Sequence, residues 1–213
     1  MVDRKITALK RQKKNQERVS VYLDGEFAFG LPEDAAIALR TGQTLSEAEI
    51  AALQDKDRFA RLRDQATHYL SYRPRSVAEV RRHFLRKGHE EALVERVIAY
   101  LSERALLDDE AFARYWVEQR ETFKPRSRLA LRQELYKRGV DAAAIDAAID
   151  DVDELAAARR AAEKLAWKWR GLDYDRLRAK LGGYLQRRGF GYDIVRLIVE
   201  ETWADSGADE TAT

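Results

Sequence analysis

Residues 80–88 read VRRHFLRKG, and the same pattern returns as LRQELYKRG at 131–139 and as LGGYLQRRG at 181–189. The three closing glycines are 51 and then 50 residues apart. Each copy keeps two apolar positions four residues apart and two basic residues directly before the glycine. A fixed period with apolar positions kept indicates a repeated supersecondary unit whose copies stack on one another. The repeated charges add something that folding does not require, and they favour a one-sided basic surface for an extended anionic or filamentous partner.

Most helix signals recur from copy to copy. A break at Pro74 and Pro125 separates a first helix from a second, because proline disfavours a helical conformation in the residue before it. The glycine after two basic residues is a left-handed cap, and a third helix follows it. The sequence therefore predicts a mainly α fold, with tandem three-helix repeats of about fifty residues in an elongated array.

The N-terminal segment reads differently. Residues 19–23 alternate and are rich in β-branched and aromatic side chains, Asp24-Gly25 supplies a turn, and residues 27–29 return. Asp-Gly between two such runs predicts a β-hairpin. Residues 6–10 add a third strand, and a short helix follows from Pro32 to about Arg40.

The chain then divides into five segments. These are a β lobe with a short helix over 1–45, a long connecting helix and the first repeat over 46–107, the second repeat over 108–153, the third repeat over 154–203, and a disordered tail over 204–213.

Composition sets limits on function. The chain has 213 residues, 36% of them charged, with a net charge of only +2, so a basic function must come from segregation of charge. The absence of Cys excludes disulfides, thiolate metal sites and cysteine nucleophiles. No stretch approaches the ~20 apolar residues of a membrane span. We expect a cytoplasmic monomer with no membrane partner.

Catalytic arrangements are absent from the sequence. His68, His83 and His89 lack metal-ligand spacing. Gly182-Gly183 lies in a helical pattern without the Lys-Ser/Thr of a phosphate-binding loop. We therefore expect no enzyme, no metal site and no cofactor.

Cations recur on the face of each second helix that points away from its apolar residues. At about 100° per residue, Arg82 and Arg86 oppose Val80 and Phe84. A solvated face explains any one such helix, but recurrence in three copies favours a surface for phosphates or carboxylates. The candidate partner- or DNA-binding residues are Arg73, Arg75, Arg82, Arg86, Lys124, Arg126, Arg128, Lys137, Lys180 and Arg187.

Tyr72 and Phe123 precede the first two breaks at equivalent positions. Such aromatic side chains can stack on bases. More often they pin a loop to the core, and that is our expectation here.

Several segments together resemble the RecX family of bacterial recombination regulators. They are the stretch from Tyr69 to Ser76, the arginine-rich helix ending at Lys87-Gly88, and the junction from Leu106 to Ala113. Residues 21–31 are similar to the hairpin of longer family members, so the resemblance covers nearly the whole chain. The third repeat departs from the pattern, because Asp175 stands where the other copies have proline. We therefore expect unequal binding by the three repeats.

The resemblance implies a RecA modulator acting in DNA recombination, DNA repair and the SOS response. Such proteins are built from tandem three-helix repeats in an elongated crescent. They bind in the helical groove of the RecA–single-stranded DNA filament, hinder its extension, promote its disassembly, and depress ATP hydrolysis and strand exchange. The implied partners are RecA and this filament, with direct DNA contact left open.

Two other classes stay open from the residues alone. One is a DNA-binding protein that uses its three-helix units like helix-turn-helix domains. The other is a helical scaffold for an unrelated protein. A DNA-binding protein would bind bare DNA and filament alike, whereas a scaffold would bind neither.

Overall fold

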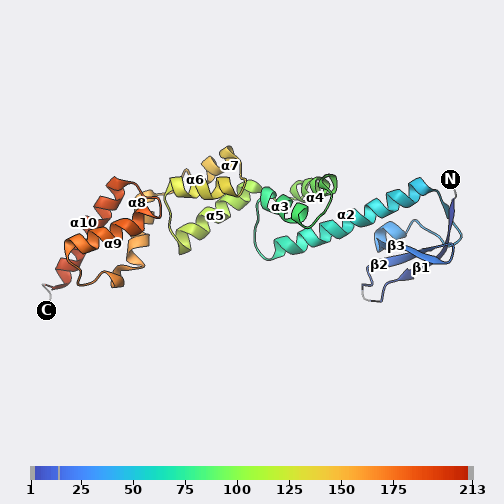
Figure 1. The fold of residues 1–213 in the computed structure, drawn as a ribbon, viewed down its shortest axis with the longest axis horizontal. Helices are drawn as coiled ribbons and strands as arrows, with labels where there is room; N and C mark the ends of the chain where they lie inside the picture. Colours follow the sequence, from blue (N-terminus) through green and yellow to red (C-terminus); the bar gives the residue numbers. More distant parts are fainter. Residues whose placement is uncertain (1–2, 14, 211–213) are drawn as a thin grey trace. The chain divides into compact units, whose positions relative to one another are not determined.

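A computed structural model describes the backbone of residues 3–13 and 15–210, with side chains up to Asp205 (Figure 1). Four strands come first: β1 Arg4–Arg11, β2 Arg18–Leu23, β3 Glu26–Pro32 and β4 Thr44–Leu45. The α-helices are α1 Glu33–Ala36, α2 Glu47–Ser71, α3 Val77–Arg86, α4 Glu91–Glu103, α5 Asp109–Phe123, α6 Arg128–Lys137, α7 Ala142–Ile149, α8 Glu154–Glu163, α9 Tyr174–Gln186 and α10 Tyr192–Glu210. A 3-10 turn, η1 Ala166–Lys168, follows α8. The predicted class, mainly α with a small N-terminal sheet, is confirmed.

The N-terminal sheet is antiparallel, with the strand order β3-β2-β1-β4. Between β2 and β3, Asp24 and Gly25 have φ values of 52° and 91°. Positive φ at both central positions is what a type I′ turn requires, and it matches the twist of the flanking strands. The predicted hairpin is therefore confirmed, and β1 supplies the predicted third strand.

The segment after β3 differs from our expectation. The helix α1 ends at Ala36 rather than near Arg40, and the fourth strand, β4, was not predicted. The cause is the free edge of β1: the Ile6 N–H donates to the Gln43 carbonyl, and the Gly42 N–H donates to the Ile6 carbonyl, both at 2.8 Å. Pairing of this edge draws the chain out of the helix, because unpaired backbone groups are costly.

The sheet packs on the N-terminal half of α2. Val21, Leu23 and Leu31 are fully buried, and Ile50 and Leu53 of α2 pack against their cluster. The carboxylate of Asp57 on α2 is also buried, and it forms ion pairs with Arg18 of β2 and with Arg61. A buried carboxylate requires such partners, so the lobe and α2 share one core.

Three helices separated by a break and a glycine form each repeat, as predicted. The second repeat comprises α5, α6 and α7, whose N-caps are Asp108, Ser127 and Asp141. Each cap side chain accepts a hydrogen bond from a backbone N–H of the first helical turn, which satisfies an otherwise orphan donor. The first repeat comprises the C-terminal part of α2 with α3 and α4, and the third comprises α8, α9 and α10 (Figure 1).

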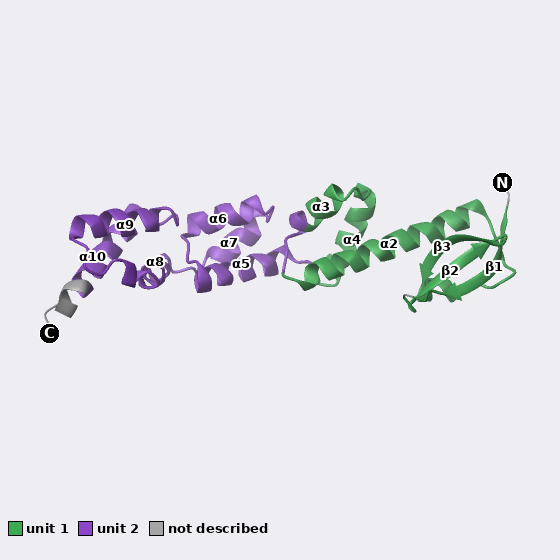
Figure 2. Cartoon of the chain, turned by 60° about the horizontal axis from the view of Figure 1, so that its bottom comes forward, with its two compact units in different colours: residues 1–73, 80–106 green, residues 74–79, 107–213 purple. Residues whose placement is uncertain are grey.

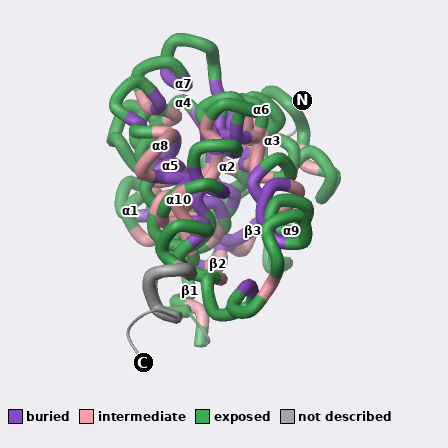
Figure 3. Tube along the Cα trace, turned by 90° about the vertical axis from the view of Figure 1, so that its left-hand side faces the viewer, coloured by how far each residue is buried: buried purple, intermediate pink, exposed green. Residues whose placement is uncertain are grey.

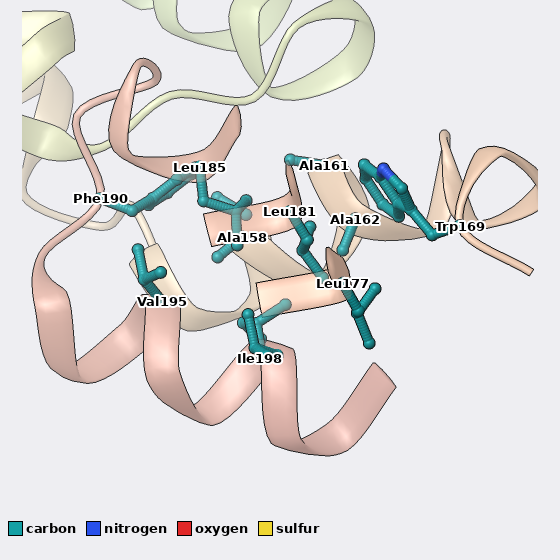
Figure 4. Packing of buried hydrophobic residues seen from close by; sticks show 12 residues of the cluster. Ala158, Ala161, Ala162, Trp169, Leu177, Leu181, Leu185, Phe190, Val195 and Ile198 are labelled. Carbon is teal, nitrogen blue, oxygen red and sulfur yellow. The ribbon is translucent and has the colours of Figure 1, made fainter. Parts of the chain in front are cut away.

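The third repeat has an alanine-rich core. The buried face of α8 presents Ala158, Ala161 and Ala162 to leucines of α9 and to Ile198 of α10 (Figure 4). Trp169, after η1, closes the same cluster at 8% exposure. Small side chains on α8 let the neighbouring helices approach closely, so the core is filled from the other two helices.

The chain divides into two compact units (Figure 2). The first comprises the described residues up to Arg73 and residues 80–106, and the second comprises residues 74–79 and the described residues from Leu107 onward. The second repeat, the third repeat and the start of α3 therefore belong to one unit. In both units, buried positions recur along the helices between exposed ones (Figure 3).

The helix α10 extends to Glu210. It therefore includes most of segment 204–213, for which the sequence predicts disorder, and residues 211–213 lie outside the described part of the chain.

Candidate partner-binding surface

The second helix of each repeat is oriented as its sequence predicts. Val80 and Phe84 of α3 are each 1% exposed, whereas Arg82 and Arg86 are exposed. The corresponding leucines of α6 and α9 are fully buried, and Lys137, Lys180 and Arg187 are exposed. The apolar positions of the repeat thus hold each second helix with its outer face toward solvent.

One exposed cation occupies the same position in all three copies. Arg86, Lys137 and Arg187, here called the register cations, lie in or directly after the last turn of α3, α6 and α9. Among the described residues, no ion pair or side-chain hydrogen bond is formed by any of them. A cation at a helix C-terminus is favoured by the helix dipole, but that role leaves its charge available to a partner.

The basic residues of the breaks behave differently from one another. Lys124 is exposed and forms no ion pair within the described part of the chain. Arg126 forms an ion pair with Glu134 at 3.2 Å and donates to the Arg187 carbonyl at 3.2 Å. Arg128 donates to the carbonyls of Val152 and Asp150 at 2.8 and 2.7 Å. Arg126 and Arg128 therefore tie the break to the rest of the second unit.

The first repeat also uses part of its basic content internally. Arg73 and Arg75 are half-buried, and they and Arg82 already take part in interactions with the rest of the chain. Arg81 of α3 donates to both carboxylate oxygens of Glu95 on α4, at 2.5 and 2.8 Å. These hydrogen bonds hold the pKa of Glu95 below its usual value, because they stabilise the charged form.

Our expectation for the two aromatic residues at the breaks is wrong. Tyr72 is 71% exposed and Phe123 is 65% exposed, so neither pins its loop to a core. The Tyr72 hydroxyl lies 2.9 Å from His68 Nε2, at the end of the same helix. Each aromatic residue is followed directly by a basic residue, Arg73 or Lys124. An exposed aromatic residue thus precedes a basic residue at the ends of α2 and α5, with Arg73 half-buried and Lys124 exposed.

The sequence did not indicate that Arg138 and Arg188, which directly follow two register cations, differ from them in burial. Arg138 and Arg188 are half-buried, and their guanidinium carbons lie 3.6 Å from the centre of the Trp116 ring and 4.5 Å from that of Tyr184. They are therefore packed within the second unit. The missing signal is non-local, because a neighbouring segment covers them.

The third repeat presents a different outer face. Gly182 and Gly183 of α9 stand where the other copies carry Arg81-Arg82 and Arg132-Gln133. A hollow of about 550 Å³ opens between α9 and α10, lined by these glycines and by Arg178 and Arg196 among others. The glycines thus replace long polar side chains beside this hollow, whereas Lys180 and Arg187 lie outside its lining.

No group of three His, Cys, Asp or Glu side chains in the part of the chain that the structure describes is placed to hold a metal ion. No helix in residues 3–13 and 15–210 combines the length and hydrophobicity needed to cross a membrane.

Family models match four consecutive parts of the chain. They describe the N-terminal domain of regulatory protein RecX at residues 4–44 and the first, second and third three-helix domains of RecX at residues 63–101, 108–149 and 151–199. The predicted order, a β lobe before three helical repeats, corresponds to this order of domains.

Whole-chain comparisons agree. Regulatory protein RecX of Bacillus licheniformis is 31% identical over 97% of this chain and 81% of its own length. That of Bacillus subtilis is 29% identical over 96% of this chain and 79% of its own length. A crystal structure of regulatory protein RecX aligns with a TM-score of 0.74 and 27% identity, over 92% of this chain and 99% of that one. The chain therefore belongs to the RecX family of regulatory proteins.

Proposed function

We propose that this protein binds the RecA filament on single-stranded DNA and slows its ATP hydrolysis and strand exchange. The observation that carries the proposal is the register cation, exposed at the same position in three repeats of a RecX-family chain. A filament repeats its own surface, so a protein with a repeated contact can engage it several times. Each exposed charge contributes little by itself, about 0.2–1 kcal/mol. Linked contacts strengthen the overall affinity, because each later contact forms within a complex that already exists.

RecA-dependent ATP hydrolysis tests the proposal. The cognate RecA is assembled on poly-dT, and the protein is titrated from a small fraction of the RecA concentration up to equality. We expect the rate of ATP hydrolysis to fall at protein concentrations well below that of RecA. Unchanged hydrolysis at equal concentrations would contradict the proposal.

A second function, direct contact with single-stranded DNA, is favoured by the exposed Tyr72 and Phe123 beside Arg73 and Lys124. Stacking of a base on an aromatic side chain contributes about 1–3 kcal/mol. Binding of the protein to bare poly-dT is measured beside binding to the filament. Similar affinities for both would favour DNA contact over RecA contact, and failure to bind either would favour a scaffold for another protein.

A further inference from the structure

The turn that ends α9 is held against the break of the preceding repeat. The Ser127 N–H donates to the Arg188 carbonyl at 3.2 Å, and Arg188 Nη1 donates to the Pro125 carbonyl at 2.9 Å. Ser127 is 1% exposed and Pro125 is buried. The carbonyl at the end of α9 would otherwise lack a partner. Each repeat thus satisfies a backbone group of the other.

The corresponding segments also meet one repeat earlier in the same compact unit, through different atoms. Ser76 Oγ donates to the Arg138 carbonyl at 2.7 Å, and Arg138 Nη1 donates to Glu79 Oε1 at 2.6 Å. Ser76 is fully buried. Ser76 and Ser127 occupy equivalent positions in the 51-residue period, as do Arg138 and Arg188 at an offset of 50. The meeting of the arginine turn with the preceding serine is therefore a repeated feature of the fold, with the hydroxyl donating at Ser76 and the backbone N–H donating at Ser127.

The three register glycines, Gly88, Gly139 and Gly189, share a backbone conformation but differ in how closely a neighbouring segment packs on them. All three have positive φ, at 85°, 82° and 89°. A Cβ on Gly139 would overlap the Cβ of Ala78, and a Cβ on Gly189 would lie 2.5 Å from Ser127 Oγ and 2.9 Å from the Cβ of Ala130. A Cβ on Gly88 would meet no atom of the described residues within 4 Å. Gly139 and Gly189 thus permit close approach of a neighbouring segment, whereas Gly88 supplies the positive φ of its own turn.

We infer that two segments form a joint: the turn at Arg188 and Gly189, and the break at Pro125 with the following Ser127. This joint holds the second and third repeats in one fixed arrangement. In this joint Arg188 and Gly189 are positioning residues, whereas the adjacent Arg187 is exposed. The joint sets the distance between Lys137 and Arg187, which lie on the two repeats that it connects. The importance of that distance for binding rests on the proposed function, but the rigidity of the joint does not.

The distance between the two repeats can be measured directly. The chain contains no Cys, so Gln133→Cys on α6 and Ala179→Cys on α9 give a single pair of spin labels at exposed positions. We expect a narrow distance distribution in this parent. Gly189→Ala, which inserts the clashing Cβ, should broaden the distribution about twofold or displace it, since repeats without a fixed interface move relative to one another.

Two matched controls isolate the joint. Gly88→Ala also places an alanine at a positive φ, but its Cβ meets no described neighbour. This variant should therefore leave the distance distribution unchanged. Arg187→Met changes an exposed side chain and should also leave it unchanged, whereas Arg188→Met removes the hydrogen bond to Pro125 and should broaden it. Arg188→Met adds no bulk to the turn, so it keeps the test valid if Gly189→Ala fails to fold. A narrow, unshifted distribution in Arg188→Met would overturn the inference.

The effect of the joint on filament binding is measured separately from the distance. In the hydrolysis assay, Arg188→Met should need about tenfold more protein for half-maximal inhibition, because the linked contacts lose their preset spacing. If the parent protein fails to inhibit, the proposed function falls and the distance distributions still decide the joint. If Arg188→Met broadens the distribution but inhibits normally, the claim that the joint sets the binding distance is overturned.

Discussion

The last turn of the second helix reads almost alike in the first and third repeats, Arg86-Lys87-Gly88 and Arg187-Arg188-Gly189, yet the two turns lie in different surroundings. Both glycines have positive φ. Lys87 is exposed, and no described segment packs on Gly88. Arg188 is half-buried, and Gly189 packs on Ser127. The backbone of such a turn follows its local sequence. Whether its middle cation serves the fold or the surface depends on the segment that packs against it.

The largest effect is expected where the two turns agree, at the buried apolar position one turn before each glycine. Phe84→Ala should lower the free energy of unfolding by about 3–5 kcal/mol, because it removes a buried ring that is only 1% exposed. Urea unfolding followed by circular dichroism measures the loss. Leu85→Ala, next to it and 36% exposed, should cost less than about 1 kcal/mol. Equal costs at both positions would contradict the orientation of α3.

A smaller effect separates the two serines that meet the Arg–Gly turns. Ser76 Oγ both accepts from the Glu79 N–H and donates to the Arg138 carbonyl, so Ser76→Ala should cost about 2 kcal/mol. Ser127→Ala loses its cap hydrogen bond to the Ala130 N–H but keeps its backbone contact with Arg188, so it should cost about 1 kcal/mol. Thermal unfolding of both variants tests the order. A larger loss at Ser127 would show that the first contact is the weaker one.

The smallest effect is pH-dependent and concerns the cation that the first repeat uses internally. Arg81 lowers the folded-state pKa of Glu95, so the pair stabilises the fold above the unfolded pKa of glutamate, and this stability is lost as pH falls through the lowered folded pKa. The Glu95 side chain is 42% exposed, so the gain is well under about 1 kcal/mol. Glu95→Gln should therefore lower the melting temperature slightly at neutral pH and lose this difference below about pH 4. A difference that grows in acid would contradict the pairing.

Features that depend on local sequence were predictable. Asp24-Gly25 with its alternating flanks predicted the hairpin, and the apolar spacing predicted the three-helix repeats, because both depend on residues close in sequence. The strand β4 was not predictable, since two residues show no alternation and their pairing partner, β1, lies about forty residues away.

The candidate surface divides along the same line. Arg86, Lys137 and Arg187 were predicted to point outward, and their exposure agrees. The inward position of Arg188 was not predictable, because Arg187 and Arg188 are chemically identical neighbours and only the break of the preceding repeat distinguishes them. The exposure of Tyr72 and Phe123 was mispredicted for a related reason: no segment in the described part of the chain covers them.

The most direct test of the central claim, that the register cations bind the filament, reverses the three charges together. The variant Arg86→Glu, Lys137→Glu, Arg187→Glu is compared with Lys56→Glu, Arg114→Glu, Arg170→Glu, which makes the same change in net charge at exposed positions outside the register. Affinity for the cognate RecA filament is measured for both at matched helicity and melting temperature. We predict a loss of about tenfold or more for the register variant and about twofold or less for the control, because only the former places repulsion at the contact. Equal losses in the two variants, or none in the register variant, would contradict the account.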